Sequence, residues 1–181
     1  MNECVNVFVF YYSLSSIFFY SLIKLNIKKE YETKPFTHSH IHTLIMEQTF
    51  FQIASTLVLP QWLLMIFLPK WKGTKWLRDH PVIPIALAVM YAGFVLIDIG
   101  SFNPNSFSTL AAVKELFASD KALLAGWIHY LAFDLLIGSY ISKDAIERGI
   151  HPLLIAPCLF FTFMFGPVGW LLYQIIKLFK K

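Results

Sequence analysis

Charged residues are scarce in this chain of 181 residues. Asp, Glu, Lys and Arg together make up 14% of it, against roughly 25% of an average soluble domain. Hydrophobic residues account for 57%, so the composition indicates an integral membrane protein rather than a soluble domain. The 15 Lys and Arg residues lie at the ends and in loops, where we expect them to meet lipid headgroups and not nucleic acid.

Cysteine is nearly absent as well. Cys4 and Cys158 lie far apart within apolar segments and form no CxxC or CxxH spacing, which excludes a disulfide framework and a zinc site of the usual spacing. No HExxH or ExxH motif occurs in the chain. We therefore expect both cysteines to be packing residues, and we expect neither a metal nor another cofactor.

Four uncharged or nearly uncharged segments are long enough to cross a bilayer, which takes roughly 20 apolar residues. They predict an all-α membrane bundle with four core transmembrane helices. The last segment is long for one straight helix and contains Pro157, Gly166, Pro167 and Gly169, so we expect a kink or break in its second half. The segments are Phe50 to Leu68, Val82 to Phe102, Ala122 to Ile141 and Leu153 to Phe179.

A further apolar segment, Val5 to Ile23, is also long enough to span a membrane. It lacks a basic leading region and a small-residue cleavage site, which favours a retained helix over a signal peptide. A polar linker, Lys24 to Ile45, follows it and contains three histidines. The sequence therefore predicts a four-helix unit over residues 46–181, and residues 1–45 are either an appended anchor or an extension from an upstream start codon.

The basic residues of the predicted loops are spread over both sides of this unit. The loops at residues 70–80 and 142–150 share one side and carry six of them. The loop after the second span and the end of the chain carry five. With six against five, the positive-inside rule does not set the orientation.

Two titratable residues lie inside the third predicted span. His129 and Asp134 interrupt an otherwise apolar run, and a charge at the bilayer centre costs roughly 2.5 to 3.5 kcal/mol on insertion scales. At about 100° per residue, Trp127, Tyr130 and Asp134 fall on one stripe of the helix, whereas His129 lies about 140° from Asp134. Such residues usually face the bundle interior and serve a polar task.

Asp98, at the end of the second span, is the third intramembrane candidate. It lies on the side where the third span begins, so His129 is a plausible neighbour, and the two would form a buried acid and base. Two simpler interpretations stay open. Asp98 is hydrated at the membrane surface, or His129 is a neutral residue that bridges two helices through hydrogen bonds.

Aromatic residues are abundant in the third and fourth spans. A surface of these residues beside a glycine would suit a long conjugated or isoprenoid ligand, although helix packing explains the small residues of the fourth span equally well. The candidate ligand-binding residues are Trp127, Tyr130, Phe165, Gly166 and Trp170.

Several short motifs together resemble the abscisic acid-deficient 4 family. They are the run Ala125 to Leu135, Gly138, Asp144-Ala145, His80-Pro81 and Phe165 to Gly169. The resemblance covers residue 46 to about residue 177, and the chain departs from the family pattern at Ser139, where a basic residue is frequent. It implies a small membrane protein of the kind that plants need to make neoxanthin from violaxanthin in the plastid, with relatives in bacteria.

The resemblance and the residues lead to two hypotheses. The first is a cofactor-independent isomerase of carotenoids or related isoprenoids, in which His129, Asp134 and Asp98 supply the acid and base. The second is a non-catalytic membrane bundle that binds pigment or lipid, or that holds membrane partner proteins or further copies of itself together. Both place the protein in a membrane, the bacterial inner membrane or, for a plant-type protein, the plastid membrane.

Overall fold

The computed structural model describes residues 38–101 and 103–179. The helix expected over Val5 to Ile23 and most of the polar linker lie outside these residues. The chain divides into two units between Ile45 and Met46, and all the side-chain contacts given below lie within the second unit.

Every regular element in the described part of the chain is helical, which confirms the predicted all-α class. Helix α2 begins at His38, so the last part of the expected linker is helical. The elements are α2 (His38–Phe67), α3 (Lys72–Asp79), α4 (Val82–Ile97), two short 3-10 turns (Ile99–Ser101 and Pro104–Phe107), α5 (Leu110–Leu116), α6 (Asp120–Glu147), α7 (Pro152–Phe165) and α8 (Pro167–Leu178).

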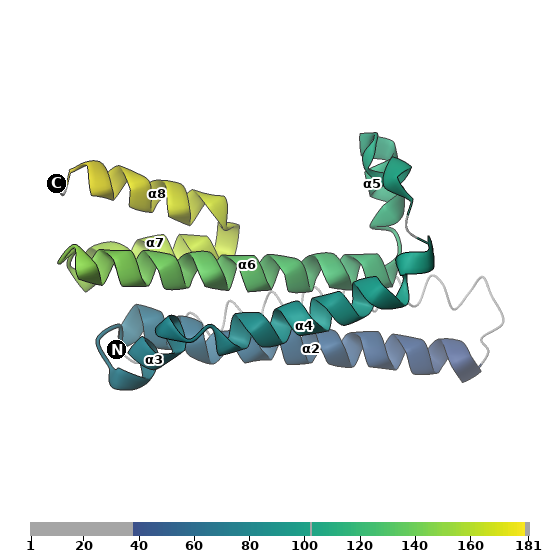
Figure 1. Ribbon diagram of the computed structural model, residues 1–181, viewed down its shortest axis with the longest axis horizontal. Helices are drawn as coiled ribbons and strands as arrows, with labels where there is room; N and C mark the ends of the chain where they lie inside the picture. Colours follow the sequence, from purple (N-terminus) through teal and green to yellow (C-terminus); the bar gives the residue numbers. More distant parts are fainter. Residues whose placement is uncertain (1–37, 102, 180–181) are drawn as a thin grey trace. The chain divides into compact units, whose positions relative to one another are not determined.

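Three helical segments of the described chain are long and apolar enough to cross a membrane: Ile45–Phe67, Lys72–Ile97 and Asp120–Glu147. They contain most of each of the first three predicted spans. Figure 1 shows α2, α4 and α6 running alongside one another. These three helices form the part of the fold that we expect to cross the bilayer.

The fourth predicted span is different in the structure. The segment is divided at Gly166 into α7, of 14 residues, and α8, of 12 residues. At about 1.5 Å per residue, each leg is about 20 Å long, which is short of a bilayer core of about 30 Å. The chain reverses between them, because Lys177 near the end of α8 lies 2.9 Å from Asp144 near the end of α6. The expected kink is therefore a helical hairpin.

Two glycines make this hairpin. Gly166 has φ +50° and ψ −97°, a conformation that side-chain-bearing residues rarely adopt. Gly169 lies so close to α7 that an added Cβ would overlap the backbone of Thr162 and Cys158. The two legs are thus in backbone contact, which explains why a tight reversal forms here and not at Pro157, which lies inside α7.

The interface of α2 with α6 holds much of the core. Trp62, Val58 and Leu135 are fully or almost fully buried. Polar side chains within this interface find partners across it: Gln61 Nε2 donates to Ser139 Oγ at 3.0 Å. An interhelical hydrogen bond within a membrane is worth about 0.6 to 2 kcal/mol, so this one favours the observed register of the two helices.

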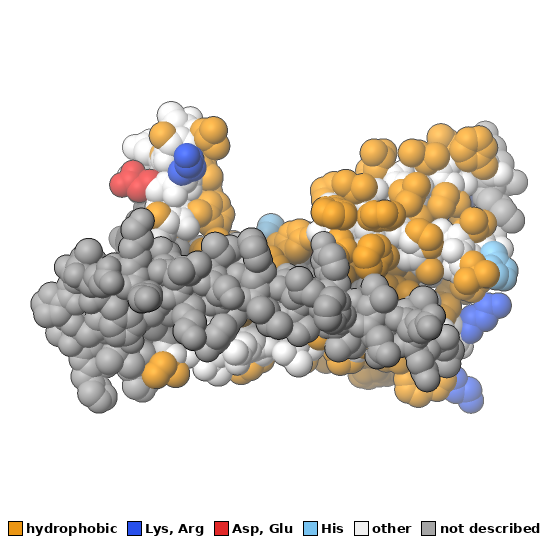
Figure 2. Space-filling model, turned by 180° about the vertical axis from the view of Figure 1, so that it is seen from behind, with side chains coloured by type: hydrophobic (Ala, Val, Ile, Leu, Met, Phe, Trp, Pro, Cys, Tyr) orange, Lys and Arg blue, Asp and Glu red, His pale blue; other side chains and the backbone are white. Residues whose placement is uncertain are grey.

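Large apolar side chains remain exposed on the outer faces of α4 and of the hairpin. Figure 2 shows them gathered over the hairpin. Exposed apolar surface on this scale needs an apolar surrounding, which is what a bilayer provides.

Candidate functional site

The site is built on one stripe of α6. Trp127, Tyr130 and Asp134 follow one another at spacings of three and four residues and so share a helix face. The rings of Trp127 and Tyr130 are 5.7 Å apart, and the Tyr130 hydroxyl is within hydrogen-bonding reach of the Asp134 carboxylate. The stripe that the seven-residue spacing predicts is therefore present.

Trp127 is held in place from α2. Its indole Nε1 donates to Ser55 Oγ at 3.0 Å, and its ring lies 5.7 Å from that of Phe51. These two contacts hold the indole in place, so the Trp127 ring lines one end of the stripe.

The hairpin meets the other end of the stripe. A Cβ placed on Gly166 would lie 2.8 Å from Asp134 Oδ1, so the carboxylate packs against the tip of the hairpin. Gly166 precedes α8, whose first turn has no side-chain cap. The tip offers few donors, because the Gly166 N–H donates to the Thr162 carbonyl oxygen at 2.8 Å and Pro167 has no N–H. The contact between Asp134 and the tip is therefore one of close packing.

The depth of this contact follows from the helix lengths. Asp134 precedes the end of α6, at Glu147, by 13 residues, or about 20 Å. Leg α7 has 14 residues and brings Gly166 to the same depth. In a bilayer core of about 30 Å, Asp134 and Gly166 then lie well inside the hydrocarbon region.

One oxygen of the Asp134 carboxylate has no hydrogen-bond partner. Its side chain is half-buried, and its Oδ2 atom is buried without a hydrogen-bond partner. An unpaired carboxylate oxygen in apolar surroundings is costly and is typical of a group that exchanges protons or binds a ligand. Phe165, which adjoins Gly166, is 55% exposed.

The structure places His129 elsewhere. Its side chain is exposed, and its ring lies 5.5 Å from Tyr91 of α4 and 4.6 Å from Phe133. His129 therefore faces the α4 side of α6, whereas Asp134 faces the hairpin. The convergence of His129 with Asp134 that an acid and base pair would need is not seen.

Asp98 is also separate from Asp134. It forms the C-cap of α4 and is exposed, as in the interpretation that has it hydrated at the membrane surface. Asp98 follows Tyr91, the neighbour of His129, by seven residues, or about 10 Å along the helix.

The remaining predicted ligand-binding residues line the outside of the hairpin. Phe165 stacks on Phe161 with ring centres 6.2 Å apart, and Trp170 is 41% exposed. Of the predicted set, Trp127, Tyr130 and Gly166 thus adjoin Asp134 or its stripe, and Trp170 presents its ring to the surroundings.

A second polar centre was not predicted from the sequence. Asp144 accepts a hydrogen bond of 2.6 Å from the Tyr173 hydroxyl and forms ion pairs with Lys177 at 2.9 Å and Arg148 at 3.0 Å. These contacts join the end of α6 to the end of α8 and hold the hairpin against α6. The spacing of Asp144 to Arg148, and of Tyr173 to Lys177, is four residues in each case, which was the available signal.

The described side chains include no group of three or more His, Cys, Asp or Glu residues placed to hold a metal ion.

Two comparisons with known proteins match most of the described helices. A family described as ABA DEFICIENT 4-like matches residues 49–173, from α2 into α8. The chloroplastic protein ABA DEFICIENT 4 of Arabidopsis thaliana is 30% identical over 142 residues, which cover 72% of this chain and 61% of that protein. The chain thus spans about three fifths of the length of this relative. No solved structure matches the chain.

Proposed function

Because the chain belongs to the ABA DEFICIENT 4-like family, we propose that it is a multi-pass membrane protein that isomerises an epoxycarotenoid or a related isoprenoid. The family resemblance implies a part in making neoxanthin from violaxanthin. The relative is a chloroplastic protein, and we propose a plastid membrane as the location.

One observation carries the catalytic part of this proposal: the carboxylate of Asp134 lies against the hairpin tip at Gly166 with one oxygen unpaired. A carboxylate held deep in an apolar fold needs a purpose that offsets its cost. Phe165 beside the tip is exposed where we expect lipid, which suits a substrate that arrives dissolved in the bilayer.

The proposed reaction balances without a cofactor. The epoxide C–O bond beside the polyene breaks, the oxygen gains a proton and becomes a hydroxyl, and a polyene carbon loses a proton as the allene forms. Tyr130 donates the proton to the epoxide oxygen, and Asp134 takes the proton from carbon. The proton then returns from Asp134 to Tyr130, because the two side chains are within hydrogen-bonding reach.

The surroundings of Asp134 contribute to both steps. The hairpin tip packs against Asp134, which acts as the base in its carboxylate form. The aromatic surface of Trp127 and Tyr130 aligns a conjugated chain along α6. His129 and Asp98 have no step in this reaction, since they face other surfaces.

The test is conversion by the purified protein. Vesicles that contain violaxanthin and the full-length chain alone should yield an allenic product of unchanged mass, detected by chromatography and mass spectrometry. Vesicles with the Asp134→Asn variant should yield none. If the purified chain is inactive but supports conversion in cells that supply other proteins, the accessory or pigment-binding hypothesis replaces the enzyme.

A further inference from the structure

The reversal of the chain at Gly166 concentrates positive charge at one end of the helices. Because α8 returns to the end of α6, Lys177 joins the basic residues of α3 and of the loop after α6. Among the described residues, seven basic and three acidic ones gather there, a net charge of four positive units. They are Lys70, Lys72, Lys75, Arg78, Lys143, Arg148 and Lys177, with Asp79, Asp144 and Glu147. We call this the basic end.

The opposite end is acidic. Glu47, at that end of α2, is electrostatically coupled to Asp98, Asp120 and Lys121. With Lys114 and Glu115 of α5, this end carries four acidic residues and two basic ones among those described. The two ends therefore differ in the sign of their charge, and only the basic end attracts anions.

Helix α3 gives the basic end the features of a membrane surface. Trp71 and Trp76 are 55% and 53% exposed, and Lys72 and Lys75 are exposed beside them. Tryptophan with lysine on a short amphipathic helix is typical of the headgroup level. Thr74 fixes the helix to the end of α2 by donating to the Leu68 carbonyl oxygen at 2.7 Å.

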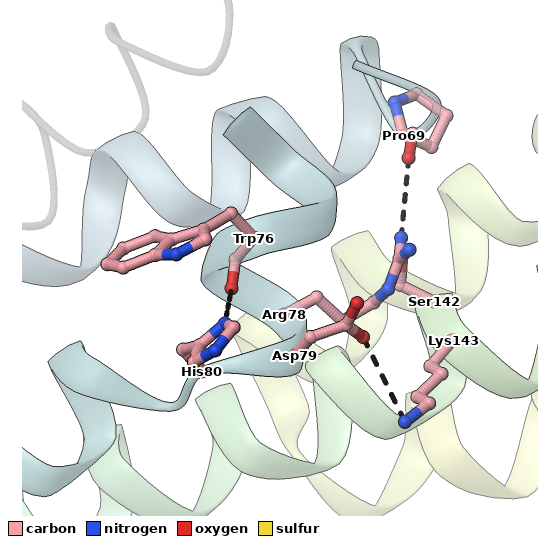
Figure 3. A network of polar contacts seen from close by, with 7 residues as sticks. All are labelled: Pro69, Trp76, Arg78, Asp79, His80, Ser142 and Lys143. Carbon is pink, nitrogen blue, oxygen red and sulfur yellow. Dashed lines mark hydrogen bonds and ion pairs between the residues drawn. The ribbon is translucent and has the colours of Figure 1, made fainter. Parts of the chain in front are cut away.

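Arg78 lies at the basic end and is held only by long hydrogen bonds. Figure 3 shows its guanidinium between the Pro69 carbonyl and Ser142, with Asp79 paired instead to Lys143. Its contacts are long, 3.3 Å to Pro69 O and 3.4 Å to Ser142 Oγ, and its Nε is buried without a partner. Among the described residues, no carboxylate forms an ion pair with Arg78.

We propose that the basic end binds the headgroups of anionic lipids, and that Arg78 takes an oxygen of the lipid phosphate. A guanidinium presents a fork of donors that matches phosphate. The two Nη1 contacts of Arg78 are long, so a headgroup at the level of Trp71 and Trp76 can compete for this donor. The exposed lysines of α3 add electrostatic attraction to anionic headgroups, which does not need a specific hydrogen-bond geometry. This inference does not depend on the isomerase reaction.

The test compares lipids by thermal stability. The full-length protein in a neutral detergent is titrated with phosphatidylglycerol, with phosphatidylcholine, or with inorganic phosphate at the same concentration. Phosphatidylglycerol should raise the midpoint of unfolding by several degrees, and the other two should leave it within one degree. Equal shifts with both lipids would overturn the proposal, and an equal shift with inorganic phosphate would show a free-anion site instead of a lipid site.

Substitutions test whether the phosphatidylglycerol headgroup binds at Arg78. Arg78→Gln should remove most of the shift, and Arg78→Lys should restore only part of it, because lysine lacks the fork. Lys114→Gln makes the same change in charge at the acidic end and should keep the full shift; loss of the shift in this variant would contradict the assignment. Should Arg78→Gln not fold, Lys72→Gln combined with Lys75→Gln, both exposed, should still reduce the number of phosphatidylglycerol molecules that native mass spectrometry finds bound. An unchanged number would equally refute the proposal.

Discussion

Asp134 and Gly166 pack against each other across two helices: a Cβ on Gly166 would lie 2.8 Å from Asp134 Oδ1. The contact exists because the chain reverses at Gly166, at the depth that Asp134 occupies on α6. A continuous fourth span would have carried the end of the chain to the opposite side of the membrane.

Gly166→Ala should destabilise the protein by about 1 to 3 kcal/mol, because alanine is strained at this φ and its Cβ would crowd the carboxylate. Gly169→Ala should destabilise it further, since the Cβ would overlap the backbone of Thr162. Gly93→Ala is the matched control: nothing lies within 4 Å of an added Cβ, and alanine should stabilise α4 by up to about 1 kcal/mol. Thermal unfolding in detergent measures all three, and equal midpoints would argue against the hairpin.

The Asp144 centre should hold the hairpin in place. Tyr173→Phe keeps the buried ring but removes the 2.6 Å hydrogen bond to Asp144, and loss of a bond to a charged group costs about 1.5 to 3 kcal/mol. Tyr140→Phe, at a tyrosine that is 47% exposed, should change stability by less than about 0.5 kcal/mol. Denaturation of both variants under one set of conditions makes the comparison, which fails if the two lose the same stability.

The hairpin changes the charge count on which an orientation can be predicted. Because Lys177 lies beside Asp144, the described residues give seven basic residues at one end and two at the other. From the positive-inside rule we predict that the basic end faces the cytoplasm or, in a plastid, the stroma. In a chain whose Cys4 and Cys158 are replaced by alanine, an impermeant maleimide should label Asn105→Cys from outside, but Lys75→Cys and Phe179→Cys only after permeabilisation. Labelling of Phe179→Cys together with Asn105→Cys would instead indicate a fourth span.

His129→Phe should leave product formation within about twofold of the unchanged chain, since phenylalanine preserves the ring contacts with Tyr91 and Phe133. The measurement is the yield of allenic product per amount of protein in the membrane. A loss of tenfold or more, about 1.4 kcal/mol in barrier height, would return His129 to the reaction.

The sequence predicted the helices better than their arrangement. Mean hydropathy over about 20 residues locates α2, α4 and α6, because burial in lipid selects length and composition alone. The segment from Leu153 to Phe179 is equally apolar on both sides of Gly166, so hydropathy cannot tell a hairpin from a kinked span. The backbone conformation of Gly166 determines that this segment forms a hairpin.

Only the part of the site that lies within α6 could be predicted from the sequence. The stripe of Trp127, Tyr130 and Asp134 follows from helix geometry within one element. The partner of Asp134 and the separation of His129 depend on how α6 is rotated against α4 and the hairpin, which no spacing within α6 specifies. The contacts of Asp144 with Tyr173 and Lys177 were not predicted, because these partners reach it only after the chain reverses.

We propose that Asp134, held at the hairpin tip, performs the proton transfer. Asp134→Asn keeps the size of the side chain but can no longer exchange a proton in this way. Expressed in a host that accumulates violaxanthin, this variant should reach the membrane at the normal level and form no neoxanthin, while the matched Asp98→Asn variant should form it normally. Neoxanthin at the normal level from membrane-inserted Asp134→Asn would contradict the account.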